Sequence, residues 1–453
     1  MKKKIDLSRD KIDFGTGKIG PLFRVLFFPT LIGMVFMSLQ TVIDGIFVGQ
    51  GVGADGIAAV NIVAPLWMVA TGLGLMFGIG ASVIGGVHLA EKNVKAACII
   101  LTQSFGVGFF ITLILSLLCL CFPMAVVYAL GCSKPLERLA LDYLLGLLPG
   151  MAFLFWQCEG MMLVRLDGSP RYAMWIQVAG AVTNIVLDWL FIFPLGMGVK
   201  GAAIATAIAC GVGGLMSLVY FVWFSSSLKF YRLKTSVTSL LLTLRNLRDM
   251  AKIGFATFLT EIAMSITILV GNYQFMGMLH EDGVAAFAII CYLFPVIFSV
   301  NNAVAQAAQP IISYNYGAKQ DLRVSRTLHL SLLTALTCGI IVMLTMIVGA
   351  ETLVGMFLRP EENAYGIATG GLPWFSICSV FFALNVVFIG YCQSVTNAGR
   401  AIVYTVLRGI IFPLATFMLL PLFFGTTGLW LAIPAAELAT LLIIVFVQFR
   451  NRL

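Results

Sequence analysis

The sequence has little charge, little histidine and no nucleotide-binding loop. Only 11% of its 453 residues are charged and only three are histidine, whereas 60% are hydrophobic. A soluble domain is excluded, because so few polar residues cannot cover that much apolar surface. The pattern GxxxxGK[ST] is missing, which argues against an ATP-driven pump. Ten cysteines are present without a CxxC pair, so we expect neither a tightly bound metal nor a disulfide framework.

What the chain has in abundance is apolar sequence in runs of membrane-crossing length. A spanning helix needs about 20 residues. The apolar runs and their breaks predict twelve spans, at 21–48, 57–87, 96–124, 136–164, 171–194, 199–224, 252–279, 284–315, 325–350, 364–394, 400–422 and 427–449. The expected fold is therefore an all-α polytopic membrane protein with twelve transmembrane helices. We expect the first helix to be retained rather than cleaved as a signal peptide.

The basic residues are distributed unequally between the two sides of this predicted topology. With twelve spans both termini face the same side, and 24 of the 28 Lys and Arg residues fall there. The positive-inside rule then predicts that both termini are cytoplasmic. This topology accounts for the net charge of +8, so we expect no nucleic-acid partner. Every Lys and Arg is expected in a loop or at a helix end.

The chain also repeats itself at one fixed offset. Asp55-Gly-Ile-Ala-Ala reappears as Asp282-Gly-Val-Ala-Ala 227 positions later, and Gly198-Val-Lys-Gly lies over Gly425-Thr-Thr-Gly at the same offset. A period of six helices gives both copies the same orientation, which predicts two parallel six-helix lobes. The predicted bounds are 1–224 for the N-terminal lobe, 225–251 for a cytoplasmic connector and 252–453 for the C-terminal lobe. Such a pair of lobes is typical of alternating-access transporters.

Acidic residues inside the apolar runs are the candidates for function. A carboxylate at membrane depth is costly and by default indicates a functional site. The five such residues are Asp44, Glu159, Asp188, Glu261 and Glu437.

Asn184 lies one turn before Asp188 on the fifth expected helix, so both side chains point from one face. With Thr206 on the sixth helix they offer the oxygen ligands that H⁺ or Na⁺ prefers.

The repeat favours an ion site over a structural role for two of these acids. Positions 227 residues after Asp44 and Asp188 are Gly271 and Ala415, so the C-terminal lobe lacks both carboxylates. If the acids only stabilised the fold, both lobes would need them. The alternative is that the polar groups merely form hydrogen bonds between helices.

Four further residues are candidates for a cavity or a hinge. Gln40 precedes Asp44 by one turn, Glu261 interrupts the seventh helix, and Asn385 lies in the tenth. Pro29 removes a backbone hydrogen bond in the first helix and favours a bend there, which serves either as a hinge or as a static kink.

Six segments, in order along nearly the whole chain, resemble the MATE (multidrug and toxic compound extrusion) family. They are Val42-Ile-Asp44-Gly-Ile-Phe-Val-Gly, Asp55-Gly-Ile-Ala-Ala-Val, Asp167-Gly-Ser-Pro-Arg171, Asn184-Ile-Val-Leu-Asp188-Trp-Leu-Phe-Ile, Gly198-Val-Lys-Gly-Ala-Ala-Ile-Ala-Thr206 and Gln309-Pro-Ile-Ile-Ser-Tyr-Asn315-Tyr-Gly317.

The resemblance implies a prokaryotic inner-membrane antiporter that exports organic cations or other amphipathic drugs in exchange for H⁺ or Na⁺. It implies ion-coupling roles for Asp44, Asn184, Asp188 and Thr206, and a bend at Pro29. In a branch that uses acids of the C-terminal lobe, Glu261 matches one acid, but here the tenth helix has no carboxylate.

We therefore expect a transporter and not an enzyme, with no cofactor other than the coupling ion, H⁺ or Na⁺. Its expected partners are small organic cations or amphipathic drugs and membrane lipid, and we expect a monomer. The alternative is a flippase for lipid-linked saccharides. Because its cargo carries phosphate, that function calls for Arg or Lys within the spans, and none is expected there. A channel or scaffold without ion coupling would leave the one-sided acids unexplained.

Overall fold

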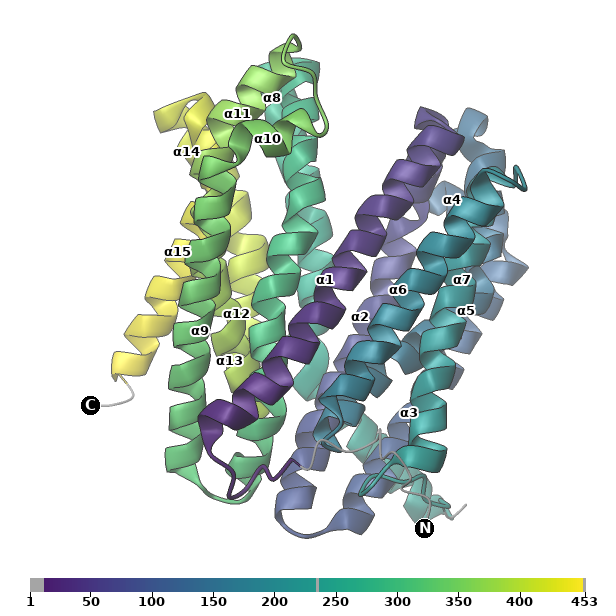
Figure 1. The fold of residues 1–453 in the computed structure, drawn as a ribbon, viewed down its shortest axis with the longest axis vertical. Helices are drawn as coiled ribbons and strands as arrows, with labels where there is room; N and C mark the ends of the chain where they lie inside the picture. The colour runs from purple at the N-terminus through teal and green to yellow at the C-terminus, as the bar shows by residue number, and fades with distance from the viewer. Residues whose placement is uncertain (1–11, 234–235, 451–453) are drawn as a thin grey trace, which may run out of the picture. The chain divides into compact units, whose positions relative to one another are not determined.

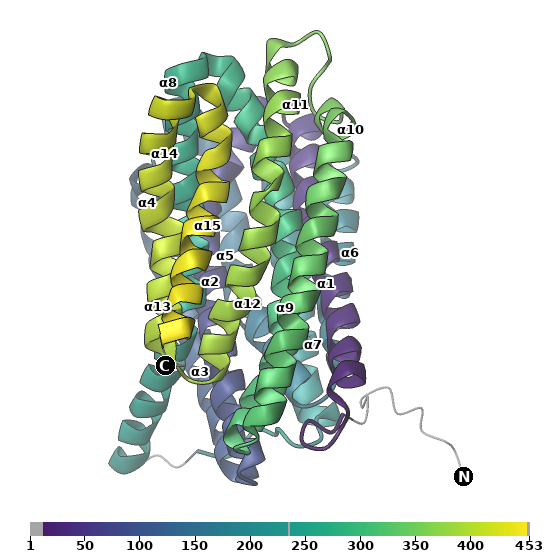
Figure 2. The ribbon, with the colours of Figure 1, turned by 90° about the vertical axis from the view of Figure 1, so that its left-hand side faces the viewer.

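The computed structural model describes residues 12–233 and 236–450, and all regular secondary structure in these ranges is helical (Figures 1 and 2). The all-α prediction is confirmed. Several basic residues of the predicted topology lie outside the described residues, namely Lys2, Lys3, Lys4, Arg9, Lys11, Lys234 and Arg452.

The first half of the chain forms a series of long helices with short connections. They are α1 (Ile19–Gly51), α2 (Ala54–Ala90), α3 (Val94–Cys121), the short α4 (Pro123–Ala129), η1 (Lys134–Leu136), α5 (Glu137–Leu166), α6 (Pro170–Ile192), α7 (Gly198–Val219) and the π-helical turn η2 (Tyr220–Phe224).

The second half has more interruptions. Its elements are α8 (Val237–Gly317), α9 (Asp321–Val348), α10 (Ala350–Gly355), α11 (Asn363–Ser376), α12 (Cys378–Ser394), α13 (Ala398–Val406), the π-helical turn η3 (Leu407–Ile411), α14 (Phe412–Phe424) and α15 (Thr426–Arg450).

These elements give the twelve predicted spans. Within the described residues, ten helices are long and apolar enough to cross a membrane, and α11 with α12 forms one further span bent by 41°. The 81-residue α8 is broken at His280, where φ is 54° and ψ is −147°. It therefore counts as two spans, which meet where the sequence predicts a break between residues 279 and 284.

The backbone repeats with the offset seen in the sequence. Left-handed φ angles occur at Gly53 (93°) and His280 (54°), at Lys92 (61°) and Lys319 (57°), and at Gly198 (59°) and Gly425 (57°). The members of each pair are 227 positions apart. Because such φ angles are uncommon outside glycine, their recurrence shows that both halves turn in the same way between their helices.

The chain divides into two compact units, each of which we describe by itself. The first unit contains the chain up to Phe258 together with Pro310–Val324, and the second contains Leu259–Gln309 and the chain from Ser325 onward. Helices α1 to α7 lie wholly in the first unit, and α10 to α15 lie in the second. The lobe bounds expected from the sequence stay a prediction, since these units are defined by contacts and not by the repeat.

Small residues allow α5 and α7 to approach closely in the first unit. A Cβ atom added to Gly146 would lie 2.7 Å from the Cβ of Ala203, and one added to Gly150 would lie 2.5 Å from the Cα of Ala207. Neither distance leaves room for a methyl group, so these glycines set the separation of the two helices.

Asp167, which follows α5, fastens the start of the connector. Its Oδ1 accepts hydrogen bonds from the backbone N–H groups of Ser227 (2.8 Å) and Leu228 (2.9 Å). Its Oδ2 accepts from the N–H of Ser226 and from the hydroxyl of Tyr220, both at 2.8 Å. The connector is therefore anchored to the end of α5 at residues 226–228.

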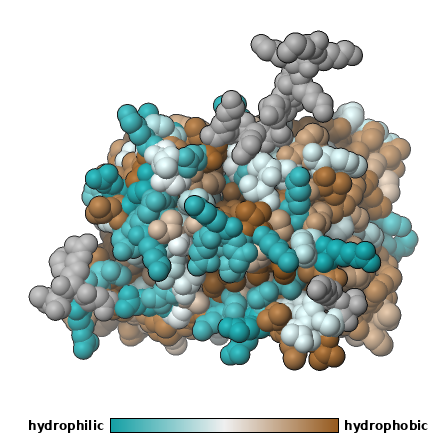
Figure 3. Space-filling view, turned by 90° about the horizontal axis from the view of Figure 1, so that it is seen from below, coloured by the Kyte–Doolittle hydropathy of each residue, from teal (hydrophilic) through white to brown (hydrophobic). Residues whose placement is uncertain are grey.

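Helix α8 begins fifteen residues earlier than the apolar run predicts, at Val237. Ser236 caps it by accepting a hydrogen bond from the N–H of Ser239 at 3.2 Å, which is a common way to start a helix. The charged residues between 245 and 252 lie before the apolar run begins, but they do not prevent a helix. Figure 3 shows hydrophilic side chains gathered at one end of the helices, as expected where helices leave a membrane.

Candidate functional site

The first unit brings Asp44 of α1 and Asp188 of α6 together. Asp188 is fully buried, at 0% exposure, whereas Asp44 is partly exposed. Their carboxyl groups are close enough to hydrogen-bond to each other when one of them holds a proton. Asp44 Oδ1 and both carboxylate oxygens of Asp188 are buried and make no hydrogen bond of ordinary geometry with a described residue, and Asn184 is the further polar neighbour of Asp188. The two oxygen-rich groups are therefore available to a small cation.

Asn184 and Thr206 complete the set that the sequence predicts. The Nδ2 of Asn184 donates a hydrogen bond to the Oγ1 of Thr206 at 3.2 Å, joining α6 to α7. Both residues are buried. In the described part of the chain the Oδ1 of Asn184 has no partner, and its side chain lies beside Asp188 one turn further along α6.

Tyr143 of α5 belongs to the same group, although no sequence argument singles it out. Its side chain is buried and lies near enough to both Asp44 and Asp188 for their charges to act on it. A phenol can donate a hydrogen bond to a carboxylate, so Tyr143 provides a donor beside the acidic pair. A tyrosine within an apolar run carries no pattern that would reveal this.

The geometry favours the uptake of one positive ion. Two carboxylates side by side in a medium of low dielectric repel each other strongly unless a proton or a cation lies between them. A proton needs only the two carboxyl groups, whereas Na⁺ would also use the oxygens of Asn184 and Thr206. Across residues 12–233 and 236–450, no group of three or more His, Cys, Asp or Glu side chains has a metal-site arrangement.

The remaining predicted residues lie apart from this group or in the other unit. Gln40 is partly exposed on α1, one turn before Asp44, and Pro29 lies within α1. Glu261 is partly buried on α8 in the second unit. Asn385 is fully buried on α12 and is bound to Glu437.

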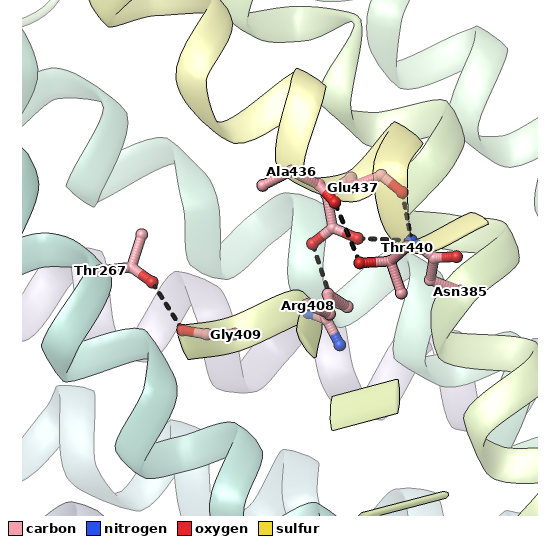
Figure 4. Close-up of polar contacts among 7 residues, drawn as sticks. All are labelled: Thr267, Asn385, Arg408, Gly409, Ala436, Glu437 and Thr440. Atoms are coloured by element: carbon pink, nitrogen blue, oxygen red, sulfur yellow. Dashed lines mark hydrogen bonds and ion pairs between the residues drawn. The ribbon is translucent and has the colours of Figure 1, made fainter. Parts of the chain in front are cut away.

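The second unit contains a buried ion pair (Figure 4). The Nε of Arg408 donates to the Oε1 of Glu437 at 2.7 Å. The Nδ2 of Asn385 donates to the Oε2 of Glu437 at 2.7 Å and to its backbone oxygen at 2.8 Å. The guanidinium of Arg408 also lies over the ring of Phe382, 4.3 Å from its centroid.

The expectation that every Lys and Arg lies in a loop or at a helix end is wrong for Arg408. This residue lies in η3, in the middle of the span formed by α13, η3 and α14, and only 7% of it is exposed. Glu437 on α15 neutralises it, and this makes a buried arginine tolerable. Hydropathy does not reveal that Arg408 is buried, because Arg400 and Arg408 together resemble the polar beginning of a helix.

Comparison with known proteins covers most of the chain. A family model described as MatE matches residues 29–190 and, a second time, residues 255–417. The offset between the two matches agrees with the offset of the internal repeat to within one position.

The multidrug export protein MepA of Staphylococcus saprophyticus is 24% identical over 428 residues, which cover 93% of this chain and 92% of that protein. MepA of Staphylococcus aureus strain MSSA476 is 25% identical over 440 residues, which cover 96% and 95%. A crystal structure of MATE in complex with MaL6 has a TM-score of 0.88 at 21% identity and covers 100% of this chain and 98% of that one. This last likeness establishes the fold.

Proposed function

Because the chain belongs to the MatE family, as its sequence motifs predict, we propose that it is a secondary active antiporter that exports cationic or amphipathic drugs in exchange for H⁺ or Na⁺. It is a multi-span membrane protein, and its relatives are bacterial multidrug export proteins. We assign it to the bacterial plasma membrane, with both termini cytoplasmic. In this proposal the antiporter works as a monomer.

The observation that carries the proposal is the acidic pair in the first unit. Asp44 and Asp188 come from different helices, lie within hydrogen-bonding reach through a shared proton, and have buried carboxylate oxygens that make no hydrogen bond of ordinary geometry with a described residue. Their repeat-related positions, Gly271 and Ala415, have no carboxylate. A role in exchange explains this asymmetry, whereas a role in folding does not.

In the proposed cycle, the pair holds one H⁺ or Na⁺ from outside, and Asn184 and Thr206 assist with Na⁺. Release of the ion to the cytoplasm leaves two facing negative charges, and these favour entry of a cationic substrate. A substrate and an ion then alternate, because the pair neutralises one positive charge at a time. Pro29 is the proposed hinge of α1, since the hydrogen bond missing at proline permits bending.

The test is gradient-driven ethidium transport by the purified protein in proteoliposomes, first under a proton gradient and then under a sodium gradient. Asp188→Asn keeps the shape of the side chain but removes its charge. We expect this variant to lose ethidium transport driven by either gradient. The gradient that drives the unmodified protein identifies its coupling ion.

A matched control is Asp55→Asn, which removes an exposed carboxylate in the first turn of α2. This variant should transport ethidium as the unmodified protein does. Undiminished transport by Asp188→Asn under both gradients would rule out the proposed ion site.

A flippase for lipid-linked saccharides is the second candidate, because Arg408 is a cation within a span. That is the feature such a phosphate-bearing cargo calls for. Transfer of a fluorescent lipid-linked saccharide across the same proteoliposome membranes, without ethidium export, would favour this function over drug antiport.

A further inference from the structure

The second unit contains a cavity of about 50 Å³ whose wall includes the Arg408–Glu437 pair. Most of the lining is apolar and comes from α8 and α15, and it includes Phe287 and Phe294. A cavity of this size has room for a small polar group or a few water molecules. The ion pair is its only charged part within the described residues.

Local backbone chemistry determines where Arg408 lies. Pro413 has no N–H, so it cannot donate to the carbonyl oxygen of Gly409 four residues earlier. The hydroxyl of Thr267 on α8 donates to that oxygen instead, at 3.3 Å (Figure 4). The turn widens into the π-helical segment Leu407–Ile411, as often happens at functional positions. Arg408 lies on this widened turn.

Arg408 keeps hydrogen-bonding capacity after binding Glu437. Its Nε makes the bond to Glu437, and the ring of Phe382 covers its face. In the described part of the chain no protein acceptor binds Nη1 or Nη2, which carry four of its five N–H groups. The guanidinium therefore has an unused donor edge, and the residue lines the cavity.

Thr405 adds a second donor on the same side of the span. It lies three residues before Arg408, lines the same cavity and is 2% exposed. Its hydroxyl has no hydrogen-bond partner among the described residues. An unpaired buried hydroxyl is costly, so an acceptor from a ligand would relieve it.

These donors match an anion better than a cation. A carboxylate accepts two parallel bonds from one guanidinium edge and a further one from a hydroxyl. A cation would approach Arg408 against its charge, and Glu437 already accepts bonds from Arg408 and Asn385.

The pair belongs to the second half of the chain alone. The repeat-related positions of Arg408 and Glu437 are Ala181 and Cys210, so a role in folding would not be shared between the halves. Asp44 and Asp188 show the reverse asymmetry, because their carboxylates occur in the first half and have no counterpart in the second.

We propose that this cavity takes the carboxylate group of an anionic amphipath, whose apolar ring or chain remains outside the enclosed space. The carboxylate binds the free edge of Arg408 and the hydroxyl of Thr405. Glu437 holds the arginine in place through Nε and takes no part in contacting the ligand. The cargo range then extends from organic cations to organic acids.

The test is equilibrium dialysis of three radiolabelled probes against the full-length protein in phosphatidylcholine nanodiscs, with empty nanodiscs as the blank. The probes are benzoate, benzylammonium and benzamide, which share a ring and differ in charge. We expect benzoate to bind at least about tenfold more tightly than either of the others, the size of one charge-assisted hydrogen bond.

Two variants test the assignment of residues. Glu437→Gln alone would leave Arg408 buried without its counter-ion and is prone to misfolding. Arg408→Gln alone would leave Glu437 buried and unpaired and is prone to misfolding. The double variant Arg408→Gln/Glu437→Gln avoids this problem and should lose at least about tenfold in benzoate affinity. Arg400→Gln, at the start of the same span, is the matched control and should bind benzoate normally.

Preferential binding of benzylammonium, or benzoate binding that survives in the double variant, would overturn the proposal. A repeat with phosphatidylglycerol in the nanodiscs distinguishes soluble acids from lipid. Competition that requires Arg408 would support the anion site and identify a lipid head group as its occupant. No ion gradient is used, so failure here leaves the proposed antiport untouched, and failure of Asp188→Asn leaves this site untouched.

Discussion

Among the predicted ion-coupling residues, Thr206 supplies the aliphatic hydroxyl. This hydroxyl can distinguish between the two candidate coupling ions, Na⁺ and H⁺. A sodium ion needs several oxygen ligands, whereas a proton needs only one of the two carboxylates. The hydrogen bond from Asn184 to Thr206 (3.2 Å) joins that hydroxyl to the residue one turn before Asp188.

Thr206→Val should weaken transport driven by sodium and leave transport driven by protons nearly unchanged. Valine has the shape of threonine but no oxygen ligand. We expect the half-saturating sodium concentration to rise about tenfold, the effect of one lost polar contact. The measurement is initial ethidium transport against sodium concentration, repeated at fixed sodium against pH.

Thr206→Ser is the control, because it keeps the hydroxyl and should keep the sodium dependence. Equal losses under both gradients for Thr206→Val would instead mean that Thr206 supports the fold of the site.

Residues of the proposed ion site were predictable where a polar group interrupts an apolar run. Asp44, Asn184, Asp188 and Thr206 all interrupt such runs, and the structure brings them together. Tyr143 was not predictable, because tyrosine is ordinary in apolar sequence. The partnership of Arg408 with Glu437 joins residues 29 positions apart, and no periodicity links them.

At the scale of helices, apolar length predicts the spans well, and turn chemistry explains the differences. The predicted spans 57–87 and 171–194 lie within a few residues of α2 and α6. The start of α8 was missed because the serine cap at Ser236 lies beyond the apolar run. The bend of 41° between α11 and α12 was missed as well, since both parts belong to one apolar run.

The break at His280 yields a prediction about stability. Its φ of 54° and ψ of −147° belong to a region that glycine occupies almost alone, at a cost of about 1–3 kcal/mol for other residues. The repeat-related residue is Gly53, with φ 93° and ψ −166°. His280→Gly should therefore raise the free energy of unfolding by about 1 kcal/mol, measured as a higher midpoint of thermal unfolding.

Met278→Gly is the matched control, because Met278 is also exposed, at 39%, but has helical backbone angles. There glycine should lower stability by about 1 kcal/mol. If both substitutions lower the midpoint equally, the backbone at His280 is not strained.

At the scale of the whole chain, Arg323 links segments about 300 residues apart within the first unit. Its Nη2 donates to the backbone oxygens of Phe14 and Gly17, both at 2.8 Å, and its Nε donates to Asn315 Oδ1 at 2.7 Å. Asn315 in turn donates to the oxygen of Phe14 at 3.0 Å. The segment before α1 is thereby fastened to the end of α8 and the start of α9.

The fastened segment has its own turn at Asp13. Hydrogen bonds from the side chain and then the backbone of Thr16 lower the pKa of the Asp13 carboxyl group. A lowered pKa means that this carboxylate stabilises the turn at neutral pH, and that the contribution is lost as pH falls through the lowered pKa.

Arg323→Ala should release this segment. The loss of a charged hydrogen-bond donor should raise the equilibrium constant for local opening by about tenfold or more. Hydrogen exchange measured by mass spectrometry should therefore be faster in a peptide covering residues 12–18. Arg326→Ala removes an exposed arginine from the same helix and should leave that exchange unchanged. Unaltered exchange in Arg323→Ala would show that other contacts hold the segment.

The overall plan of two related halves was the most predictable property of the whole molecule, because a repeat offset can be read from short motifs such as Asp55-Gly and Asp282-Gly. The fastening by Arg323 was not predictable, since the arginine, the amide and the two carbonyl oxygens come from three separate stretches of sequence.

The contact of Gly146 and Gly150 with Ala203 and Ala207 bears on how motion in this protein is to be followed. Helices that touch without an intervening side chain cannot slide along each other unless they first separate. We therefore expect the distance between α5 and α7 to stay constant. A spin label on each of these two helices should report one sharp, unchanging distance in every condition. Displacements of α1 can then be read against that internal standard.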